Sequence, residues 1–478
     1  MDDRILEEFI QKVLIEIKNN QPEIHPSYDV SKLNGGNKLG IFSSVDQAVI
    51  AARQGFMSLN ASTLEKRKEI VMAMREQGKL YARELAQQAR DETGFGDVES
   101  KVAKNILVCN KTPGPEIIQP VAFSGDHGLT VIERAPFGVV GSITPSTNPT
   151  STLINNAISI ISAGNAVVYN VHPRAKNVSV RTIQLLNQAI QAVGGPANII
   201  TTIDPPTVEG AQQLMRHSGV DLMVVTGGPA VVKVAMQSGK RAICAGPGNP
   251  PAVVDETADI DKTAQDLVLG SSFDNNLPCT CEKEVFVVES VADQLIKSMQ
   301  NNGAVELTRD KIQILENVIF KEKGQPWDHA VMNPSLIGQS ASDILNAAGL
   351  PVEKNVKLII LQVPPEHPLV YTEQMMPVLP IVRVRNYSEA VDFALKAEQG
   401  FHHCAGIHSL DIRNLSHMAK VMNTSLFIKN GPHYAGLGYQ SEGYTSFSIG
   451  TFTREGLTTA KSFTWERRCV LVDHFRIV

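Results

Sequence analysis

The residue best suited to covalent chemistry is Cys279, in the stretch 271–285, SSFDNNLPCTCEKEV. A helical apolar pattern over 261–269 precedes it, and a strand-like run over 285–288 follows it. Asn and Pro favour turns, and Pro278 fixes its own φ, so the sequence predicts a stiffened loop between two packed elements. Such a loop can aim a thiolate, the nucleophilic form of cysteine. The alternative is that Cys279 is a small apolar residue filling a loop, because free cysteines are usually buried.

Two other places carry acid or base groups. Glu373 lies beside a Met pair ahead of a strand-like run, and its alternative role is that of a solvated loop acid. His402 and His403 are adjacent and precede Cys404. Because neighbours in a strand point to opposite faces, we expect one of these His in the core and the other on the surface.

The cysteines are few and scattered for a chain of 478 residues: Cys109, Cys244, Cys279, Cys281, Cys404 and Cys469. We therefore expect a reducing cytoplasm and no disulfide framework. Cys279 and Cys281 form a C-x-C pair without the spaced Cys or His partners of a zinc site, so no metal is expected.

Composition narrows the class of protein. Apolar residues make up 43% of the chain and charged residues 19%, which is typical of a soluble globular protein with two or three domains. The net charge is −5, without a long basic block, so nucleic acid is not an expected partner. No apolar run reaches the ~18 residues of a membrane span. The first residues, MDDR, lack the basic start of a secretory signal.

The first 37 residues divide into two parts. Residues 1–18 place apolar side chains on one helical stripe: Ile5, Leu6, Phe9, Ile10, Val13, Leu14 and Ile17. Residues 19–37 resemble a linker, with Asn, Gly and Pro near both ends. The stripe fits a docking tag for another protein, and it fits an ordinary helix folded back on its own domain equally well.

The order of elements predicts the fold class. Residues 44–108 favour long helices, one of them over 63–93, and residues 121–136 favour a β-hairpin. From Phe137 onward short apolar runs alternate with helical patterns, which indicates parallel βαβ units with a nucleotide site at the carboxyl ends of the strands. The tail over 465–478 alternates like a strand, and we expect it to pair with another subunit.

The usual G-x-G-x-x-G turn of dinucleotide-binding proteins is missing. The nearest match, GPG at 246–248, runs into two prolines and cannot open a helix. A better phosphate-binding candidate is TGGP at 226–229, which follows a strand-like run and opens a helical pattern. Glycine at such a turn also occurs for packing reasons alone.

Several motifs agree in order from about residue 38 to the end of the chain. They are TPSTNP at 144–149, AGN at 163–165, HP at 172–173, VTGG at 225–228, AGPGNPP at 245–251, FDNN at 273–276 with Cys279, EQMMPVLP at 373–380, KNGP at 429–432 and RRCVLVD at 467–473. With them the chain resembles the aldehyde dehydrogenase superfamily and, within it, the coenzyme A-acylating acetaldehyde and propionaldehyde dehydrogenases of bacterial microcompartments.

The resemblance implies an α/β, aldehyde dehydrogenase-like fold. A Rossmann-type parallel sheet would form the NAD- and CoA-binding domain over 38–118 and 137–249, and an α/β catalytic domain would cover 250–459. A small β element for oligomerisation, over 119–136 and 460–478, would give a dimer or tetramer. Residues 1–18 would be an encapsulation-type helix on the linker 19–37, which favours the docking tag over the folded-back helix.

The resemblance also implies a reaction, in which aldehyde, CoA and NAD give acyl-CoA and NADH. Cys279 matches the family nucleophile, which forms a thiohemiacetal and then a thioester. Asn148 matches the side-chain donor to the oxyanion; its alternative role is that of a turn residue before Pro149. The remaining matches are to cofactor-binding positions: Thr144, Pro145, His172, Thr226, Gly227, Gly228 and, at the nicotinamide ribose, Glu373.

One departure from the superfamily bears on the last step. Hydrolytic members carry a Glu just before a Leu-Gly-Gly run, as the base that activates water. The aligned stretch here is ICAGP at 243–247, without a carboxylate. Attack by water on a thioester is slow without a base, whereas a CoA thiolate needs less help. The missing acid therefore favours acyl transfer to CoA over a first alternative, a hydrolytic aldehyde dehydrogenase. The presence of Cys279, Asn148 and Glu373 disfavours a second alternative, a non-catalytic cargo or scaffold protein.

Other features lead to narrower expectations. Cys281 is expected to be a bystander, or a disulfide or sulfenyl amide partner under oxidation, and Cys244 has no assigned role. The loop around Cys279 favours propionaldehyde slightly over acetaldehyde, although one methylene is worth only about 1–3 kcal/mol in a pocket. The subfamily points to the cytoplasm, inside a microcompartment, with shell or cargo proteins as partners of residues 1–18.

Overall fold

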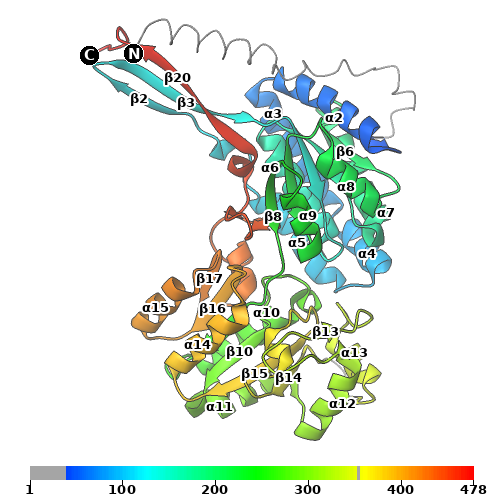
Figure 1. Ribbon diagram of the computed structural model, residues 1–478, viewed down its shortest axis with the longest axis vertical. Helices are drawn as coiled ribbons and strands as arrows, with labels where there is room; N and C mark the ends of the chain where they lie inside the picture. The colour runs from blue at the N-terminus through cyan, green and yellow to red at the C-terminus, as the bar shows by residue number, and fades with distance from the viewer. Residues whose placement is uncertain (1–38, 352–355) are drawn as a thin grey trace, which may run out of the picture. The chain divides into compact units, whose positions relative to one another are not determined.

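Two parallel β-sheets and one small antiparallel sheet organise the protein (Figure 1). The computed structural model describes residues 39–351 and 356–478, so the segments 1–18 and 19–37 lie outside the described residues. The α/β fold class is confirmed, because strands and helices alternate along most of the chain from β4 (Val139–Ile143) onward. None of the described helices is long and apolar enough to span a membrane.

The first sheet has six parallel strands. Their order is β1 (Ile41–Phe42), β6 (Ile200–Ile203), β5 (Ala166–Asn170), β4, β7 (Leu222–Thr226) and β8 (Arg241–Ala245). The central strands are buried along their whole length, as expected where helices cover both faces of a parallel sheet.

The helices of this region precede the sheet and connect its strands. They are α2 (Val45–Asn60), α3 (Leu64–Leu80), α4 (Ala82–Thr93), α5 (Val98–Lys111), α6 (Pro149–Ser162), α7 (Lys176–Ala192), α8 (Val208–Arg216) and α9 (Pro229–Met236). The single helix predicted over 63–93 is wrong, since the chain breaks at Tyr81, which has φ −100° and ψ 10°. The Ala82 carbonyl there accepts a hydrogen bond from the buried Asn105 side chain, 3.1 Å away.

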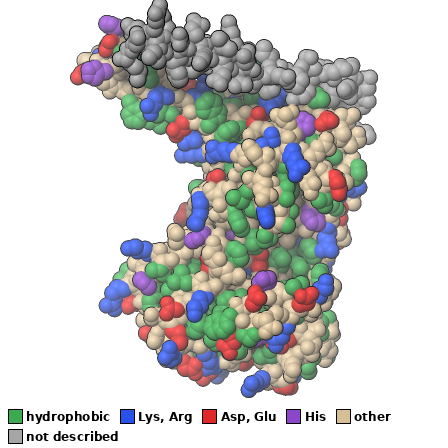
Figure 2. All heavy atoms as spheres, in the orientation of Figure 1, with side chains coloured by type: hydrophobic (Ala, Val, Ile, Leu, Met, Phe, Trp, Pro, Cys, Tyr) green, Lys and Arg blue, Asp and Glu red, His purple; other side chains and the backbone are tan. Residues whose placement is uncertain are grey.

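The second sheet has seven parallel strands. Their order is β11 (Ala304–Glu306), β14 (Leu358–Gln362), β15 (Val378–Val384), β10 (Glu284–Val288), β9 (Pro251–Val254), β16 (Cys404–His408) and β17 (Leu426–Lys429). The helices of this region are α10 (Ile260–Ser272), α11 (Glu289–Asn301), α12 (Arg309–Ile319), α13 (Ala341–Ala347), α14 (Tyr387–Glu398) and α15 (Ile412–Met422). Side chains of both charge signs are interspersed over its outer surface (Figure 2).

The third sheet is a ribbon of β2 (Val121–Gly125), β3 (Gly128–Pro136) and β20 (Thr464–Val472), seen side by side in Figure 1. The hairpin predicted over 121–136 is confirmed. Strand β20 lies at the edge of the ribbon and pairs with β3 of the same chain, in register from Thr464 opposite Pro136 to Val472 opposite Gly128, and pairing of the tail with another subunit stays a prediction. Large apolar side chains on this ribbon are exposed, among them Phe123 at 60% and Val472 at 67%.

Helix α6 is the element at which one wall of the candidate active-site cavity begins. All of its residues are buried, as in a core helix that is covered on every side. Two of its polar side chains bind one segment, since Asn155 accepts a hydrogen bond from the Phe447 backbone N–H (3.0 Å) and Asn156 accepts one from Ser448 Oγ (2.9 Å). The segment around Phe447 is thereby tied to the same helix.

The loop between α10 and β10 holds an uncommon backbone conformation. Asp274, Asn275 and Asn276 have φ values of +49°, +55° and +63° in succession, the left-handed region that Asp and Asn tolerate best among residues with a side chain. Asn276 Nδ2 donates to the Ser271 carbonyl (2.8 Å), and Asn275 Nδ2 donates to the Gly338 carbonyl (2.9 Å). The loop lies between two packed elements as predicted, and hydrogen bonds from Asn275 and Asn276 help to hold its shape.

A pair of glycines before α5 tests how tightly this loop is held. Gly94 and Gly96 both have positive φ, +73° and +69°, but only a Cβ at Gly96 would overlap the Asp274 carboxylate. We expect Gly94→Ala to cost about 1–2 kcal/mol through backbone strain alone. Gly96→Ala should cost clearly more, because Asp274 must also move. Chemical denaturation of both variants measures the difference, and equal losses would contradict a rigidly held Asp274.

Candidate active site

All nine residues singled out in the sequence line one cavity of about 370 Å³. They are Thr144, Pro145, Asn148, His172, Thr226, Gly227, Gly228, Cys279 and Glu373. The first seven follow the carboxyl ends of β4, β5 and β7, where nucleotides bind in doubly wound folds. Cys279 comes from the loop after α10, and Glu373 precedes β15, so the second sheet supplies the opposite wall.

Cys279 is half-buried, three residues after the left-handed Asn276. Burial raises the pKa of its thiol to about 12, and the Glu373 carboxylate adds to the rise, whereas Lys283 opposes it. Lys283 is fully buried, and its ammonium donates to Asn276 Oδ1 (2.5 Å) and to the Asn276 carbonyl (2.9 Å). The thiol is thus protonated at neutral pH in this form of the protein, beside a cation that supports the loop.

Asn148 lies directly before α6, with Pro149 in the first turn. Its side chain makes no capping hydrogen bond, which argues against the alternative of a simple turn residue. Instead its Oδ1 accepts a hydrogen bond from Lys104 Nζ, 2.6 Å away, and its Nδ2 donates to Thr147 Oγ1, 3.2 Å away. The amide is therefore held from one side while it faces the cavity.

Glu373 is half-buried at the cavity wall, so the alternative of a solvated loop acid does not hold. Burial raises the pKa of its carboxyl group to about 7, although Lys283 and a hydrogen bond from the Gly248 backbone oppose the rise. Among the described residues that line the cavity, Glu373 is the one carboxylate.

The turn at 226–229 has the predicted strand–turn–helix geometry. Strand β7 ends at Thr226 and α9 begins at Pro229, and the N–H groups of Val231 and Val232 donate to the Gly228 carbonyl. A Cβ placed on Gly228 would meet no atom within 4 Å, which leaves this backbone open to a ligand. His172 follows the end of β5 and is exposed, with its Nδ1 accepting a hydrogen bond from the Arg174 N–H (3.1 Å).

The stretch ICAGP at 243–247 ends β8 and reaches the cavity at Gly246 and Pro247. A Cβ on Gly246 would overlap the ring of Phe452, so this position has no room for a side chain. Cys244 and Cys281 are both buried, and neither belongs to the described lining of the cavity.

The adjacent His402 and His403 differ as expected, with His403 buried and His402 half-buried. Alternation along a strand, the predicted reason for this difference in burial, does not apply. Strand β16 begins only at Cys404, and His402 has a left-handed φ of +54°. His402 Nδ1 contacts the Asn423 carbonyl at 3.0 Å, outside the cavity lining.

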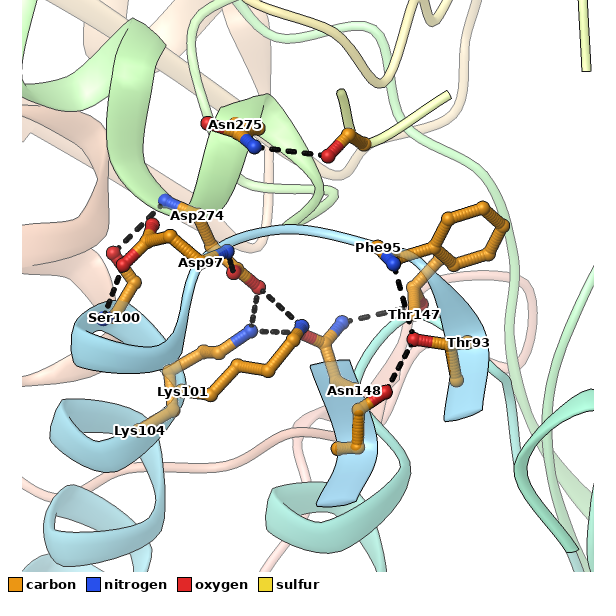
Figure 3. Close-up of polar contacts among 12 residues, drawn as sticks. Thr93, Phe95, Asp97, Ser100, Lys101, Lys104, Thr147, Asn148, Asp274 and Asn275 are labelled. Carbon is orange, nitrogen blue, oxygen red and sulfur yellow. Dashed lines mark hydrogen bonds and ion pairs between the residues drawn. The ribbon is translucent and has the colours of Figure 1, made fainter. Parts of the chain in front are cut away.

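Three charged residues behind Asn148 were missed. Lys101 and Lys104 on α5 both pair with Asp274, and all three side chains are buried (Figure 3). Two signals were available, the i, i+3 spacing of the lysines and the place of Asp274 in the FDNN motif. Also missed were wall residues from the C-terminal part of the chain: Leu437, Ser446, Phe447 and Ile449.

The charge of Glu373 provides a test of the electrostatics at Cys279. With a pKa of about 7, Glu373 is ionised at pH 8, where its charge opposes formation of the thiolate. We expect Glu373→Gln to speed the alkylation of Cys279 by iodoacetamide at pH 8 by roughly three- to tenfold. At pH 6 Glu373 holds its proton, and the two rates should converge. Peptide mass spectrometry reads the modification at Cys279 specifically.

Met375→Leu is the matched control, because it changes another residue of the cavity wall without changing charge. Its alkylation rate should follow that of the unaltered protein at both pH values. Equal rates for Glu373→Gln and the unaltered protein at pH 8 would show that Glu373 does not govern the thiol.

Comparison with known proteins agrees with this geometry. The sequence model of the aldehyde dehydrogenase family matches residues 38–312. The acetylating acetaldehyde dehydrogenase EutE of Escherichia coli (strain K12) is 46% identical over 482 residues, covering 100% of both chains.

Two solved structures are similar over nearly their whole length. Propionaldehyde dehydrogenase of Rhodopseudomonas palustris, with bound CoA and an acylated cysteine, has a TM-score of 0.88 at 44% identity, covering 91% of this chain and 98% of that chain. Propionaldehyde dehydrogenase from the fucose utilisation microcompartment of Clostridium phytofermentans has a TM-score of 0.89 at 41% identity, covering 92% and 100%. With its fold, its cavity and these matches, the chain belongs to the aldehyde dehydrogenase family.

Proposed function

We propose that this protein oxidises a short-chain aldehyde to its acyl-CoA thioester, with NAD as hydride acceptor and Cys279 as acyl carrier. The observation that carries the proposal is the content of one cavity. A nucleophile, an amide donor and an open strand–turn–helix backbone meet there, with Glu373 as the one carboxylate among the described lining residues. The relatives support it, since one is an acetylating acetaldehyde dehydrogenase and another binds CoA beside an acylated cysteine.

Cys279 forms the carbon–sulfur bond. Its thiolate adds to the aldehyde carbonyl and gives a thiohemiacetal with a negative oxygen. Asn148 Nδ2 and the Cys279 backbone N–H are the proposed donors to that oxygen. One such donor is worth about 2.7–4 kcal/mol of activation free energy in related chemistry. Loss of hydride from the thiohemiacetal then leaves a thioester on Cys279.

The first sheet offers a fitting place for NAD. Gly228 leaves its backbone open at the start of α9, and the positive end of a helix dipole suits an anionic diphosphate. Thr144, Pro145, His172, Thr226 and Gly227 would line the remainder of this site, and Glu373 would bind the nicotinamide ribose. Bound NAD supplies the acceptor for the hydride. A relative with 43% identity, an engineered glycolyl-CoA reductase, binds NADP+.

The choice of CoA over water follows from the empty base position. The resemblance puts the acid of hydrolytic members just before Gly246, and the stretch 243–247 has no carboxylate. Among the described residues that line the cavity, Glu373 is the one carboxylate. Glu373 is engaged by the proposed ribose contact. Water therefore lacks a base, and a thiolate, which needs none, completes the transfer. Two- and three-carbon aldehydes both agree with the relatives, and propionaldehyde stays the predicted preference.

Formation of NADH, followed by its absorbance, tests the proposal directly. We expect it to require both the aldehyde and CoA, with acetaldehyde, propionaldehyde and butyraldehyde compared to define chain length. NADH formed without CoA would indicate the hydrolytic alternative. No NADH under any condition would indicate a non-catalytic cargo or scaffold protein.

Substitutions separate the roles of the two neighbouring thiols and of the amide. Cys279→Ala should abolish acyl-CoA formation, and Asn148→Ala should lower kcat by roughly 10²- to 10³-fold. Cys281→Ala is the matched control, because Cys281 is buried outside the cavity lining. A loss in Cys281→Ala comparable to that in Cys279→Ala would show that Cys281 takes part in the reaction.

We also propose that the protein is a homo-oligomer inside a cytoplasmic bacterial microcompartment. The exposed apolar side chains of the β2–β3–β20 ribbon support an interface between subunits over 119–136 and 460–478. The apolar stripe of residues 1–18 supports docking to a shell or cargo protein, and a similar structure comes from a microcompartment. Consumption of a volatile aldehyde where it is made is the expected benefit.

A reporter fused to residues 1–18 tests the docking segment. We expect the fusion to co-sediment with purified microcompartment shells, because apolar residues at helical spacing suit docking in an apolar groove. The control fusion carries Ile10→Glu and Leu14→Glu, which place charges on the stripe one helical turn apart, and it should stay in the supernatant. Equal sedimentation of the two fusions, or none for either, would contradict the proposal.

A further inference from the structure

A buried charge cluster lies behind the amide of Asn148 (Figure 3). Lys104, on α5, donates one hydrogen bond to Asn148 Oδ1 at 2.6 Å and forms an ion pair with Asp274. Lys101, one turn earlier on the same helix, donates to the same Asp274 oxygen at 3.1 Å. The side chains of Lys101, Lys104 and Asp274 are 3%, 2% and 0% exposed. Charges at such depth persist only where each finds partners.

Two lysines share the one carboxylate of Asp274. Asp274 has two ammonium partners, and its other oxygen, Oδ1, accepts a hydrogen bond from the Asp97 backbone N–H (2.9 Å). Burial lowers the pKa of Lys101 to about 8, and Lys104 adds to the fall, whereas Asp274 and Asp97 oppose it. The ion pair with Asp274 does not by itself explain why Lys104 also contacts Asn148.

The hydrogen bond to Asn148 explains the position of the Lys104 ammonium. A lysine ammonium can only donate hydrogen bonds, so the amide group facing it must be the oxygen. The Asn148 nitrogen is consequently directed away from Lys104, and Thr147 Oγ1, 3.2 Å away, takes one of its two hydrogens. The rotation of the carboxamide, which is otherwise free to present either atom, is settled by this one contact.

Lys104 also joins the two parts of the chain that carry the proposed oxyanion donors. Asn148 begins α6, and Asp274 lies five residues before Cys279 in the loop after α10. A single ammonium bound to both sets the spacing between the Asn148 amide and the Cys279 backbone. Its charge further polarises the amide, because hydrogen bonds in series strengthen one another.

We propose that Lys104 is a positioning residue that orients the Asn148 carboxamide with its N–H toward the substrate oxygen and strengthens it as a donor. The inference rests on the proposed function, in which Asn148 stabilises the oxyanion. Lys104 acts through Asn148, so it affects the transition state, where negative charge develops, more than the binding of a neutral aldehyde.

A double-mutant cycle with Asn148→Ala tests the inference in the full-length protein. Lys104→Met nearly keeps the length of the side chain and leaves Asp274 paired with Lys101, so the buried carboxylate keeps an ionic partner. We expect kcat to fall roughly ten- to a hundredfold, with KM for the aldehyde within about threefold. In the Asn148→Ala background the same substitution should change kcat by less than about threefold, because the amide it orients is gone.

Lys101→Met is the matched control, since Lys101 shares the helix, the burial and the Asp274 partner of Lys104. The described structure has no hydrogen bond from Lys101 to Asn148. Its effect on kcat should therefore be the same factor with and without Asn148→Ala. Arginine also can only donate hydrogen bonds, so Lys104→Arg should recover part of the kcat lost in Lys104→Met. If Lys104→Met does not fold, Lys104→Arg takes the place of that variant in the cycle.

Each outcome decides one question. Equal factors for Lys104→Met in both backgrounds, or a loss confined to KM, would overturn the positioning role. An unaltered protein without CoA-dependent NADH formation would overturn the proposed function instead. In that case the cycle is measured by thermal unfolding, where coupling between Lys104→Met and Asn148→Ala, but not between Lys101→Met and Asn148→Ala, is still expected.

Discussion

The buried carboxylate of Asp274 is the constraint on which the geometry of the cavity depends. It lies in a loop of three consecutive left-handed residues, a conformation that each side chain disfavours. Two lysines from α5 and a backbone N–H at Asp97 hold it there. Because the same loop continues to Cys279, the ion pairs between Asp274 and the two lysines fix where Cys279 lies relative to α5. If the loop were held only by its own turns, the position of the Cys279 thiol would be less well fixed.

The two sheets contribute different properties to the cavity. The first supplies strand ends with open backbone, at Thr226–Gly228 and after β4, which suits a ligand bound through its phosphates. The second supplies side chains with altered acidity, Cys279 and Glu373, both affected by the buried ammonium of Lys283. The chemistry still needs both walls, because Asn148 comes with the first sheet and Cys279 with the second, and Lys104 contacts both Asn148 and the loop that leads to Cys279.

The sequence predicted the parts whose signals are local. Alternating apolar runs marked the parallel strands, and short motifs singled out Asn148, Cys279 and Glu373, which the fold brings to one cavity. The charge cluster escaped because Asp274 is 170 or more residues from the two lysines, and lysines at i, i+3 on a helix normally indicate a solvated face. The break at Tyr81 escaped because residues 63–93 favour helix throughout, and the contact of Asn105 with the Ala82 carbonyl is not visible in a local pattern.

The raised pKa of Cys279 has a consequence for the survival of the protein. Peroxides and stray electrophiles attack thiolates far faster than thiols. A nucleophile that burial and a neighbouring acid keep protonated is therefore latent while the cavity stands open. The same burial that raises its pKa therefore lowers the rate at which the Cys279 thiol is damaged by oxidation.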